Sequence, residues 1–166
     1  MTVTADDGGF AAWYQREHRR LVNVLVVMAG DVDLGVEVAD EAFARCLQRW
    51  DGPRRPLDPS AWTYRVAVNL LRRRWSRRRR EHRVAAVLVP PEAVELPAPA
   101  VELWRAVARL PERARMAVVL RYVGGLTERE VAQAMGVAVG TAAATLAKAR
   151  RQLATALEDP REAVDG

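Results

Sequence analysis

The stretch that decides the fold is residues 124–157, which reads GGLTEREVAQAMGVAVGTAAATLAKARRQLATAL. Thr127 and Glu130 have the spacing of a capping box, in which each side chain accepts a hydrogen bond from the backbone N–H of the other residue. Gly136 suits the left-handed residue that ends a helix, and a longer helix is predicted from about Val139. A short capped helix, a glycine turn and a longer helix together predict a helix-turn-helix.

Small residues at the start of the longer helix suit a DNA backbone. Gly140, Thr141, Ala143 and Ala144 would let the helix start approach a DNA backbone closely, and free N–H groups and the helix dipole there favour a phosphate. An ordinary helical hairpin is the alternative interpretation. The inward face of this helix is predicted to consist of Val139, Ala142, Leu146, Ala149, Leu153 and Leu157. Arg150 and Arg151 follow as candidates for phosphate contacts.

Five further helices are predicted from apolar residues that recur at helical spacing. They are expected over residues 9–29, 33–50, 59–83, 101–110 and 112–122. The third should begin sharply, because Asp58 can cap it and Pro59 suits its first position. Leu57 and Trp62 have the spacing of a hydrophobic staple across that start.

A proline-rich segment separates the third helix from the fourth. Four prolines between residues 84 and 99 rule out a continuous helix there. The predicted fold class is therefore all-α: two small helical domains, residues 1–83 and 101–166, joined by a linker over residues 84–100. The helix-turn-helix belongs to the second domain.

Composition narrows the classes of function. The chain has 166 residues and a net charge of +5, and residues 1–83 carry this whole excess, which favours a polyanionic partner. Cys46 is the single cysteine, so disulfide scaffolds and cysteine metal sites are excluded and a cytoplasmic protein is expected, with Cys46 in the core. No apolar run reaches the roughly 18 residues of a membrane span, and the N-terminus lacks a secretion-signal pattern, so no membrane insertion is expected.

Two charged clusters lie in the first domain. The acidic face of the second helix carries Glu37, Asp40 and Glu41; it is either a solvated face or a site for a basic protein surface. Residues 72–83 read RRRWSRRRREHR, with eight arginines beside Trp75. Aromatic rings next to arginines are used to bind single-stranded DNA, by stacking and backbone contact. Core packing is the alternative for such aromatics, and we favour it for Trp62 but not for Tyr64 or Trp75.

Catalytic motifs are missing from the sequence. His18 and His82 are far apart and have no metal-ligand spacing. There is neither a glycine-rich phosphate loop nor a nucleophile elbow. We therefore expect no enzyme activity, no cofactor and no metal.

Three segments in order resemble the extracytoplasmic-function sigma factors, the smallest group of the bacterial sigma-70 family. VEVADEAFARCLQRW (36–50) resembles the region that docks on the RNA polymerase clamp, and SAWTYRVAVNLLRRRWSRRR (60–79) resembles the region that opens and holds the minus-ten promoter element. Residues 110–153 resemble the region that binds the minus-thirty-five element. The resemblance implies a promoter-specificity subunit that works in the cytoplasm with nucleoid-bound core RNA polymerase, which it contacts at the clamp and flap regions. It also implies promoter DNA, both double-stranded and melted, and an anti-sigma factor as partners.

The resemblance also implies roles for individual residues. The clamp would be contacted by Glu37, Asp40 and Glu41. Minus-ten DNA would be contacted by Arg54, Arg55, Arg65, Asn69, Arg72, Arg73, Trp75 and Arg77, with the loop 51–57 capturing a flipped base. Minus-thirty-five DNA would be contacted by Thr127, Gly140, Thr141, Ala144, Thr145, Lys148 and Arg151.

The helix after the turn departs from the family pattern. GTVKSRL is common there, whereas this chain reads GTAAATL, so Ala143 and Thr145 stand where the family often has a lysine and an arginine. Each lost phosphate contact weakens DNA binding and lowers its salt dependence. Two other functions stay open from the sequence: a stand-alone helix-turn-helix regulator, and an adaptor that binds RNA or polymerase without a promoter role.

Overall fold

The computed structural model describes residues 7–81 and 100–158 of the chain. Within these ranges the fold is all-α, as predicted. The helices are α1 (Asp7–Ala29), α2 (Val32–Trp50), α3 (Pro59–Glu81), α4 (Ala100–Arg109), α5 (Glu112–Tyr122), α6 (Glu128–Met135) and α7 (Val139–Glu158). The predicted linker lies outside the described residues, except for Ala100 at the start of α4.

The helix ends follow the capping residues. The Asp58 carboxylate accepts a hydrogen bond from the Ala61 N–H at 2.9 Å before α3. Thr127 and Glu130 form the predicted capping box before α6, and Gly136 ends α6 with a φ of 67°. The predicted staple at α3 is wrong, because Leu57 projects from its loop into solvent and is fully exposed.

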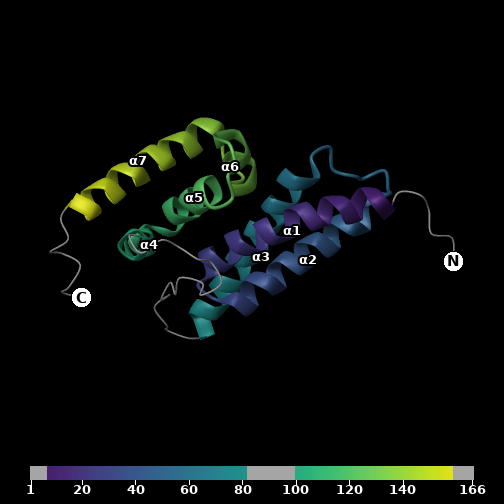
Figure 1. Ribbon diagram of the computed structural model, residues 1–166, viewed down its shortest axis with the longest axis horizontal. Helices are drawn as coiled ribbons and strands as arrows, with labels where there is room; N and C mark the ends of the chain where they lie inside the picture. Colours follow the sequence, from purple (N-terminus) through teal and green to yellow (C-terminus); the bar gives the residue numbers. More distant parts are fainter. Residues whose placement is uncertain (1–6, 82–99, 159–166) are drawn as a thin grey trace.

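The first three helices form a bundle in which α1 and α2 approach closely (Figure 1). Gly35 permits this approach: a Cβ there would lie 2.6 Å from Val26 Cγ2 and 2.7 Å from the Val26 backbone nitrogen. At the far end of the bundle, the ring centroid of Trp13 lies 5.2 Å from Phe43 and 5.1 Å from Trp50. Close backbone packing and an aromatic cluster therefore hold the two ends of the α1–α2 pair.

The inward face of α7 is shorter than the sequence predicts. Ala142, Leu146 and Ala149 are fully buried, but the predictions for Val139 and Leu157 are wrong, since these side chains are about half exposed. Both lie at the ends of α7, where the other helices no longer cover its inward side. The helix therefore packs through its middle.

The two halves of the chain are in direct contact. In Figure 1, α5 and α6 lie between α7 and the α1–α3 bundle; α6 packs on α3, and α5 packs on α1. The Gly124 carbonyl, between α5 and α6, accepts a hydrogen bond from the Arg20 guanidinium of α1. Side chains from both halves consequently join one continuous buried cluster.

Candidate protein and nucleic-acid interfaces

The predicted acidic face lies on α2 and is held by a basic residue of α3. Arg74 Nη1 lies 2.6 Å from Glu37 Oε1, and Arg74 Nη2 also pairs with Glu41. Arg45 pairs with Glu41 at 2.5 Å, one helical turn along. Arg74 therefore links α3 to α2 through two ion pairs, and we call this contact the Arg74 clip. The sequence did not indicate this role, because Arg74 lies within a run of arginines.

Asp40 is an exposed carboxylate on this face that lies outside the Arg74 clip. Its side chain is 57% exposed, and its Oδ1 lies 3.0 Å from His18 Nε2. A shallow hollow of about 250 Å³ lies beside it, lined by Phe10, Tyr14, Asp40, Phe43, Ala44 and Leu47. Burial, and then the Asp40 charge, raise the pKa of the Tyr14 hydroxyl. The site therefore combines negative charge with an apolar depression.

Leu47 corrects one expectation about α2. The sequence places it in the core stripe, but its side chain is 51% exposed and lines the hollow. Cys46 beside it is fully buried, as expected, and burial raises the pKa of its thiol. Successive residues of a helix point about 100° apart, so Cys46 and Leu47 cannot both face the core.

Arginines organise the loop before α3. The Arg55 guanidinium lies 4.5 Å from the Trp50 ring centroid, and the Arg49 guanidinium lies 5.1 Å from that of Trp62. Trp62 is only partly buried and packs against the edge of the core. Arg54 and Arg55 are exposed, so the loop presents two cations, of which Arg55 is stabilised by the Trp50 ring.

A polar stripe runs along α3 on its solvent side. The predicted minus-ten residues Arg65, Asn69, Arg72, Arg73 and Arg77 are all exposed on this helix. Arg65, Asn69, Arg73 and Arg77 recur every four residues, and Arg72 follows Asn69 by three, so all five lie on neighbouring parts of one side of the helix. The structure therefore brings these residues together as a track of basic and polar groups that continues from the loop.

The two aromatics expected to stack on bases are buried in this conformation. Trp75 is 8% exposed, and the Arg115 guanidinium of α5 lies 5.4 Å from its ring centroid. Tyr64 is 3% exposed, and burial raises the pKa of its hydroxyl. Sequence reasoning could not find Arg115, because it lies 40 residues beyond Trp75.

The start of α7 presents the small residues that the sequence predicts. Gly140, Thr141 and Ala144 are exposed, and Thr145 is half-buried, with its hydroxyl donating to the Thr141 carbonyl at 2.8 Å. A Cβ at Gly140 would meet nothing within 4 Å. The helix end is therefore open to a flat surface such as a DNA backbone.

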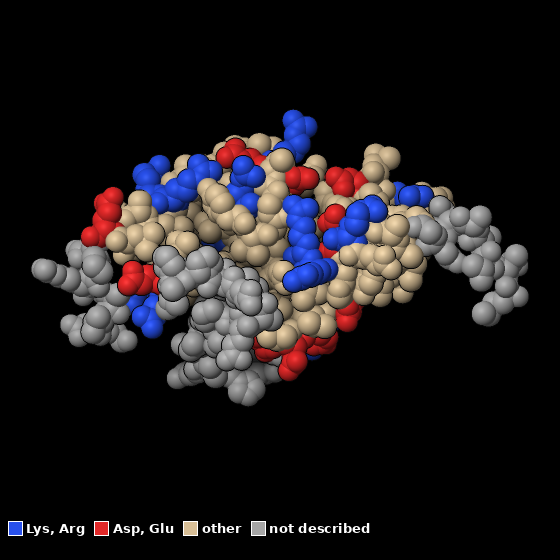
Figure 2. Space-filling model, in the orientation of Figure 1, with Lys and Arg blue, Asp and Glu red and all other residues tan. Residues whose placement is uncertain are grey.

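Some polar side chains on and near α7 bond to other residues of the protein, and others are exposed to solvent. Lys148 and Arg151 are exposed. Arg150, by contrast, donates to the Tyr122 hydroxyl at 2.8 Å and lies 3.6 Å from Glu128. The Thr127 hydroxyl is occupied by the capping box, whose hydrogen bonds lower the pKa of Glu130. On the face drawn in Figure 2, basic side chains lie over α7, while basic and acidic side chains intermix over the α1–α3 bundle.

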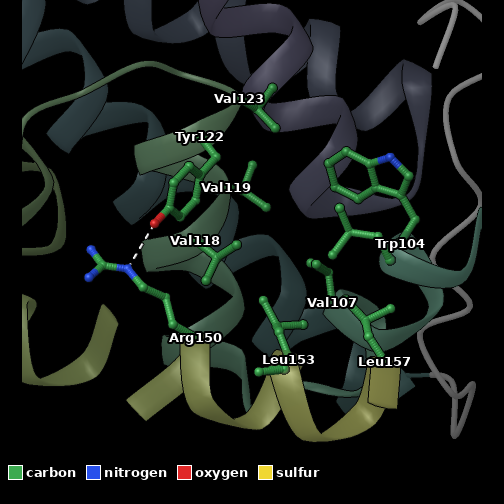
Figure 3. A pocket seen from close by; sticks show the side chains of 11 residues that line it. Trp104, Val107, Val118, Val119, Tyr122, Val123, Arg150, Leu153 and Leu157 are labelled. Atoms are coloured by element: carbon green, nitrogen blue, oxygen red, sulfur yellow. Dashed lines mark hydrogen bonds between the residues drawn. The ribbon is translucent and has the colours of Figure 1, made fainter. Parts of the chain in front are cut away.

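An apolar groove of about 550 Å³ lies between α4, α5 and α7, and sequence reasoning missed it. Its walls are formed by Leu103, Trp104, Val107, Val118, Val119, Tyr122, Val123, Leu153, Ala154 and Leu157, with Arg150 at its rim. Figure 3 shows these side chains converging from three helices. Leu157, at the end of α7, is one of these lining residues. The sequence predicts it in the core, but it forms part of the groove wall instead.

Comparison with known proteins decides the family. Residues 13–81 match the profile of Sigma-70 region 2, and residues 100–153 match that of Sigma-70, region 4. The chain belongs to the sigma-70 family. This sigma factor is similar to the ECF RNA polymerase sigma factor SigW of Bacillus subtilis (strain 168), being 26% identical over 149 residues, with 80% of each protein covered.

Solved structures share the fold of this sigma factor. One is the sigma factor RpoE in complex with the anti-sigma factor NepR from Bartonella quintana, with a TM-score of 0.73 and 18% identity, covering 93% of this chain and 99% of that one. Another is CnrH in complex with the cytosolic domain of CnrY, with a TM-score of 0.66 and 19% identity, covering 93% and 90%.

The family also decides between the functions left open by the sequence. The protein is an RNA polymerase sigma factor of the extracytoplasmic-function group, and sigma factors are transcription initiation factors without catalytic activity of their own. A stand-alone helix-turn-helix regulator is not favoured, because it would have no use for the region 2 half.

Among the described residues, no group of three or more His, Cys, Asp or Glu side chains could hold a metal ion. No single helix in the described ranges is long and apolar enough to cross a membrane, although α6 and α7, bent at 105°, together have the length and composition of a broken span.

Proposed function

We propose that this sigma factor binds core RNA polymerase through the acidic face of α2, directs it to promoters and holds the opened minus-ten strand on α3. The observation that carries the proposal is the Arg74 clip. Arg74 joins the helix bearing the acidic face to the helix bearing the basic stripe. One rigid unit can thereby present opposite charges to two different partners.

The polymerase clamp is the proposed partner of the acidic face. Asp40 is exposed beside an apolar hollow, a pairing that suits a basic helix carrying an aliphatic side chain. Glu37 and Glu41 are partly neutralised by Arg74 and Arg45, whereas Asp40, 57% exposed, offers a negative charge outside the Arg74 clip. Complementary charge of this kind chiefly sets specificity and association rate.

Melted minus-ten DNA is the proposed ligand of the loop and the α3 stripe. The exposed arginines supply phosphate contacts, and the loop 51–57 captures an unstacked base. Unstacking costs a few kcal/mol for each step, and base capture with phosphate contacts offsets it. No chemistry occurs on the sigma factor, because the polymerase supplies the catalysis.

The start of α7 is the proposed reader of the minus-thirty-five element. Gly140 and Thr141 allow close approach to the backbone, and Lys148 and Arg151 add charge. Since Ala143 and Thr145 supply no cation, contact there depends on backbone approach and DNA shape more than on charge.

The apolar groove is the proposed docking site for an apolar helix from the flap region of the polymerase. The groove is lined by apolar side chains and flanked by Arg150 and the exposed Tyr122, a combination that suits the apolar face of an amphipathic helix. One solved relative is a complex with an anti-sigma factor, so a masking protein is the competing occupant. Leu157→Glu should abolish capture of a synthetic flap peptide, while Glu158→Gln should leave it unchanged.

Charge reversal at Asp40 tests the main proposal. Asp40→Lys should abolish co-purification with core polymerase and transcription from a promoter, because it places like charges against a basic partner. Glu158→Lys makes the same charge change at the exposed end of α7 and should leave core binding unchanged. Normal assembly of the Asp40→Lys protein with core enzyme would remove the clamp assignment.

A further inference from the structure

A histidine of α1 contacts the exposed carboxylate that the proposed function assigns to the polymerase clamp. His18 Nε2 lies 3.0 Å from Asp40 Oδ1, so the contact joins two positions 22 residues apart in the chain. The Asp40 side chain is 57% exposed, whereas the His18 side chain is 29% exposed. The carboxylate can therefore meet a partner while the less exposed imidazole limits its orientation.

Two aromatic rings hold the imidazole in place. The ring centroid of His18 lies 4.7 Å from that of Tyr14 and 5.5 Å from that of Phe43, with interplanar angles of 37° and 42°. Tyr14 belongs to α1 and Phe43 to α2, and both rings also line the hollow beside Asp40. His18, the carboxylate and the hollow therefore form one packed unit across the two helices.

Two further carboxylates of α2 lie near Asp40, but basic residues pair with them. Glu37 pairs with Arg74, and Glu41 pairs with both Arg74 and Arg45. These two carboxylates therefore have cationic partners of their own. The carboxylate in direct contact with the imidazole is that of Asp40.

The other neighbours of α1 meet charges on a different side of that helix. The helices α3 and α5 also pack on α1, where Glu17 and Arg20 interact electrostatically with Tyr64 of α3. Successive helical positions point about 100° apart, so these charges do not share the side of the imidazole. On that side, burial and then the Asp40 charge raise the pKa of the Tyr14 hydroxyl, so Tyr14 stays uncharged near neutral pH.

Protonation of the imidazole changes the net charge of this unit. Histidine is the side chain that ordinarily changes charge between pH 5 and pH 8. A neutral imidazole that donates its Nε2–H to Asp40 leaves the pair with one negative charge. A protonated imidazole makes the pair neutral, so attraction to a basic partner is present at higher pH and is lost as the pH falls.

We propose that His18 is a positioning residue for Asp40 and makes binding of core polymerase depend on pH: the neutral imidazole directs the carboxylate toward a basic partner, and the protonated imidazole cancels its charge. This role of His18 rests on the proposed function, since it takes the clamp as the partner of Asp40. It adds to that function a proton-sensitive group on α1.

The test measures the Kd of the full chain for core polymerase by fluorescence anisotropy at pH 8 and pH 5.5, at constant ionic strength. The readout is the ratio of the two Kd values, compared among variants because groups on the polymerase titrate equally in every sample. His18→Gln keeps an N–H donor for Asp40 but carries no titrating ring. His82→Gln is the matched control, because it removes the other histidine of the chain.

The parent should lose about three- to five-fold more affinity than His18→Gln between pH 8 and pH 5.5, as expected for one exposed charge pair. The His82→Gln protein should keep the ratio of the parent. At pH 8, His18→Ala should bind about two-fold more weakly than His18→Gln, because alanine offers no donor to orient the carboxylate. An identical ratio for His18→Gln and the parent would overturn the proposal.

A double-mutant cycle tests whether His18 acts through Asp40. In an Asp40→Asn background, adding His18→Gln should leave the ratio unchanged, because the carboxylate is already gone. An effect of His18→Gln that persists there would overturn the proposal. If circular dichroism shows that the His18 variants are unfolded at pH 5.5, Asp40→Asn alone decides, and a ratio equal to that of the parent would overturn the proposal as well.

The two proposals fail in distinguishable ways. Normal assembly of Asp40→Lys with core enzyme would contradict the clamp assignment and, with it, the role of His18. Loss of assembly in Asp40→Lys, together with a parental ratio in His18→Gln, would contradict only the role of His18.

Discussion

The helices α3 and α7 carry most of the predicted DNA contacts, but they offer DNA different things. α3 offers side-chain charge, with Arg65, Arg72, Arg73 and Arg77 exposed along its length. α7 offers an accessible helix start with small residues and few cations. Two DNA-binding surfaces in one chain can therefore depend on different interactions: counterion release for α3, and close backbone approach for α7.

The largest expected effect concerns the packing that both helices share. Leu71 of α3 and Leu146 of α7 are fully buried, so Leu71→Ala and Leu146→Ala should each lower the free energy of unfolding by about 2–5 kcal/mol. Urea titration followed by circular dichroism measures the loss. Leu57→Ala is the control, because Leu57 is fully exposed and its truncation leaves no cavity. If either buried-leucine variant lost less free energy of unfolding than Leu57→Ala, the shared core would be contradicted.

The next prediction tests whether the exposed arginines of α3 contact DNA phosphates. Replacing Arg72, Arg73 and Arg77 with alanine should lower the slope of log affinity against log salt by about 2, at roughly 0.7 for each contact with a single strand. The measurement is holoenzyme binding to a fork-junction promoter over a salt series. The matched control replaces Arg105, Arg109 and Arg113 of α4 and α5. An equal fall in slope for the control would mean that the α3 stripe is not the phosphate track.

Adding cations to α7 tests whether the start of this helix faces DNA phosphates. Ala143→Lys with Thr145→Arg supplies cations where the family often has them, and should raise the salt slope for duplex DNA carrying the minus-thirty-five element by about 2. Filter binding of the holoenzyme measures this. The same additions at Gln133 and Ala147, outside the exposed helix start, serve as the control. An unchanged slope would show that this part of α7 does not face phosphate.

The smallest effect lies in the cap that positions the helix-turn-helix. Glu130→Gln removes a negative charge from the first turn of α6 and should reduce stability by about 0.3–1 kcal/mol at pH 7. The capping-box hydrogen bonds lower the pKa of Glu130 from its ordinary 4.5, so the folded state prefers the carboxylate. That stabilisation is fully present above pH 4.5 and is lost as the pH falls through the lowered pKa. Urea titrations of both proteins over a series of decreasing pH measure the difference, and a gap that does not narrow as the pH falls would contradict this origin.

Local features were predictable from the sequence because each depends on neighbours within a few positions. The helix boundaries, the Asp58 and Thr127 caps, the Gly136 terminus and the small-residue start of α7 all belong to this class. The acidic face and the polar stripe were predictable for the same reason, since helical periodicity alone decides which residues share a side. The order of the three segments then indicated the family.

Tertiary structure alone decided which of these residues touch one another. Arg74 clips Glu37, and Arg115 covers Trp75 from 40 positions away. Leu47 and Leu157 leave the core because no helix covers them there, and they line a hollow and a groove instead. Periodicity sets the side of a helix on which a residue lies, but burial depends on what packs against that side, and that is fixed only when segments distant in the chain meet.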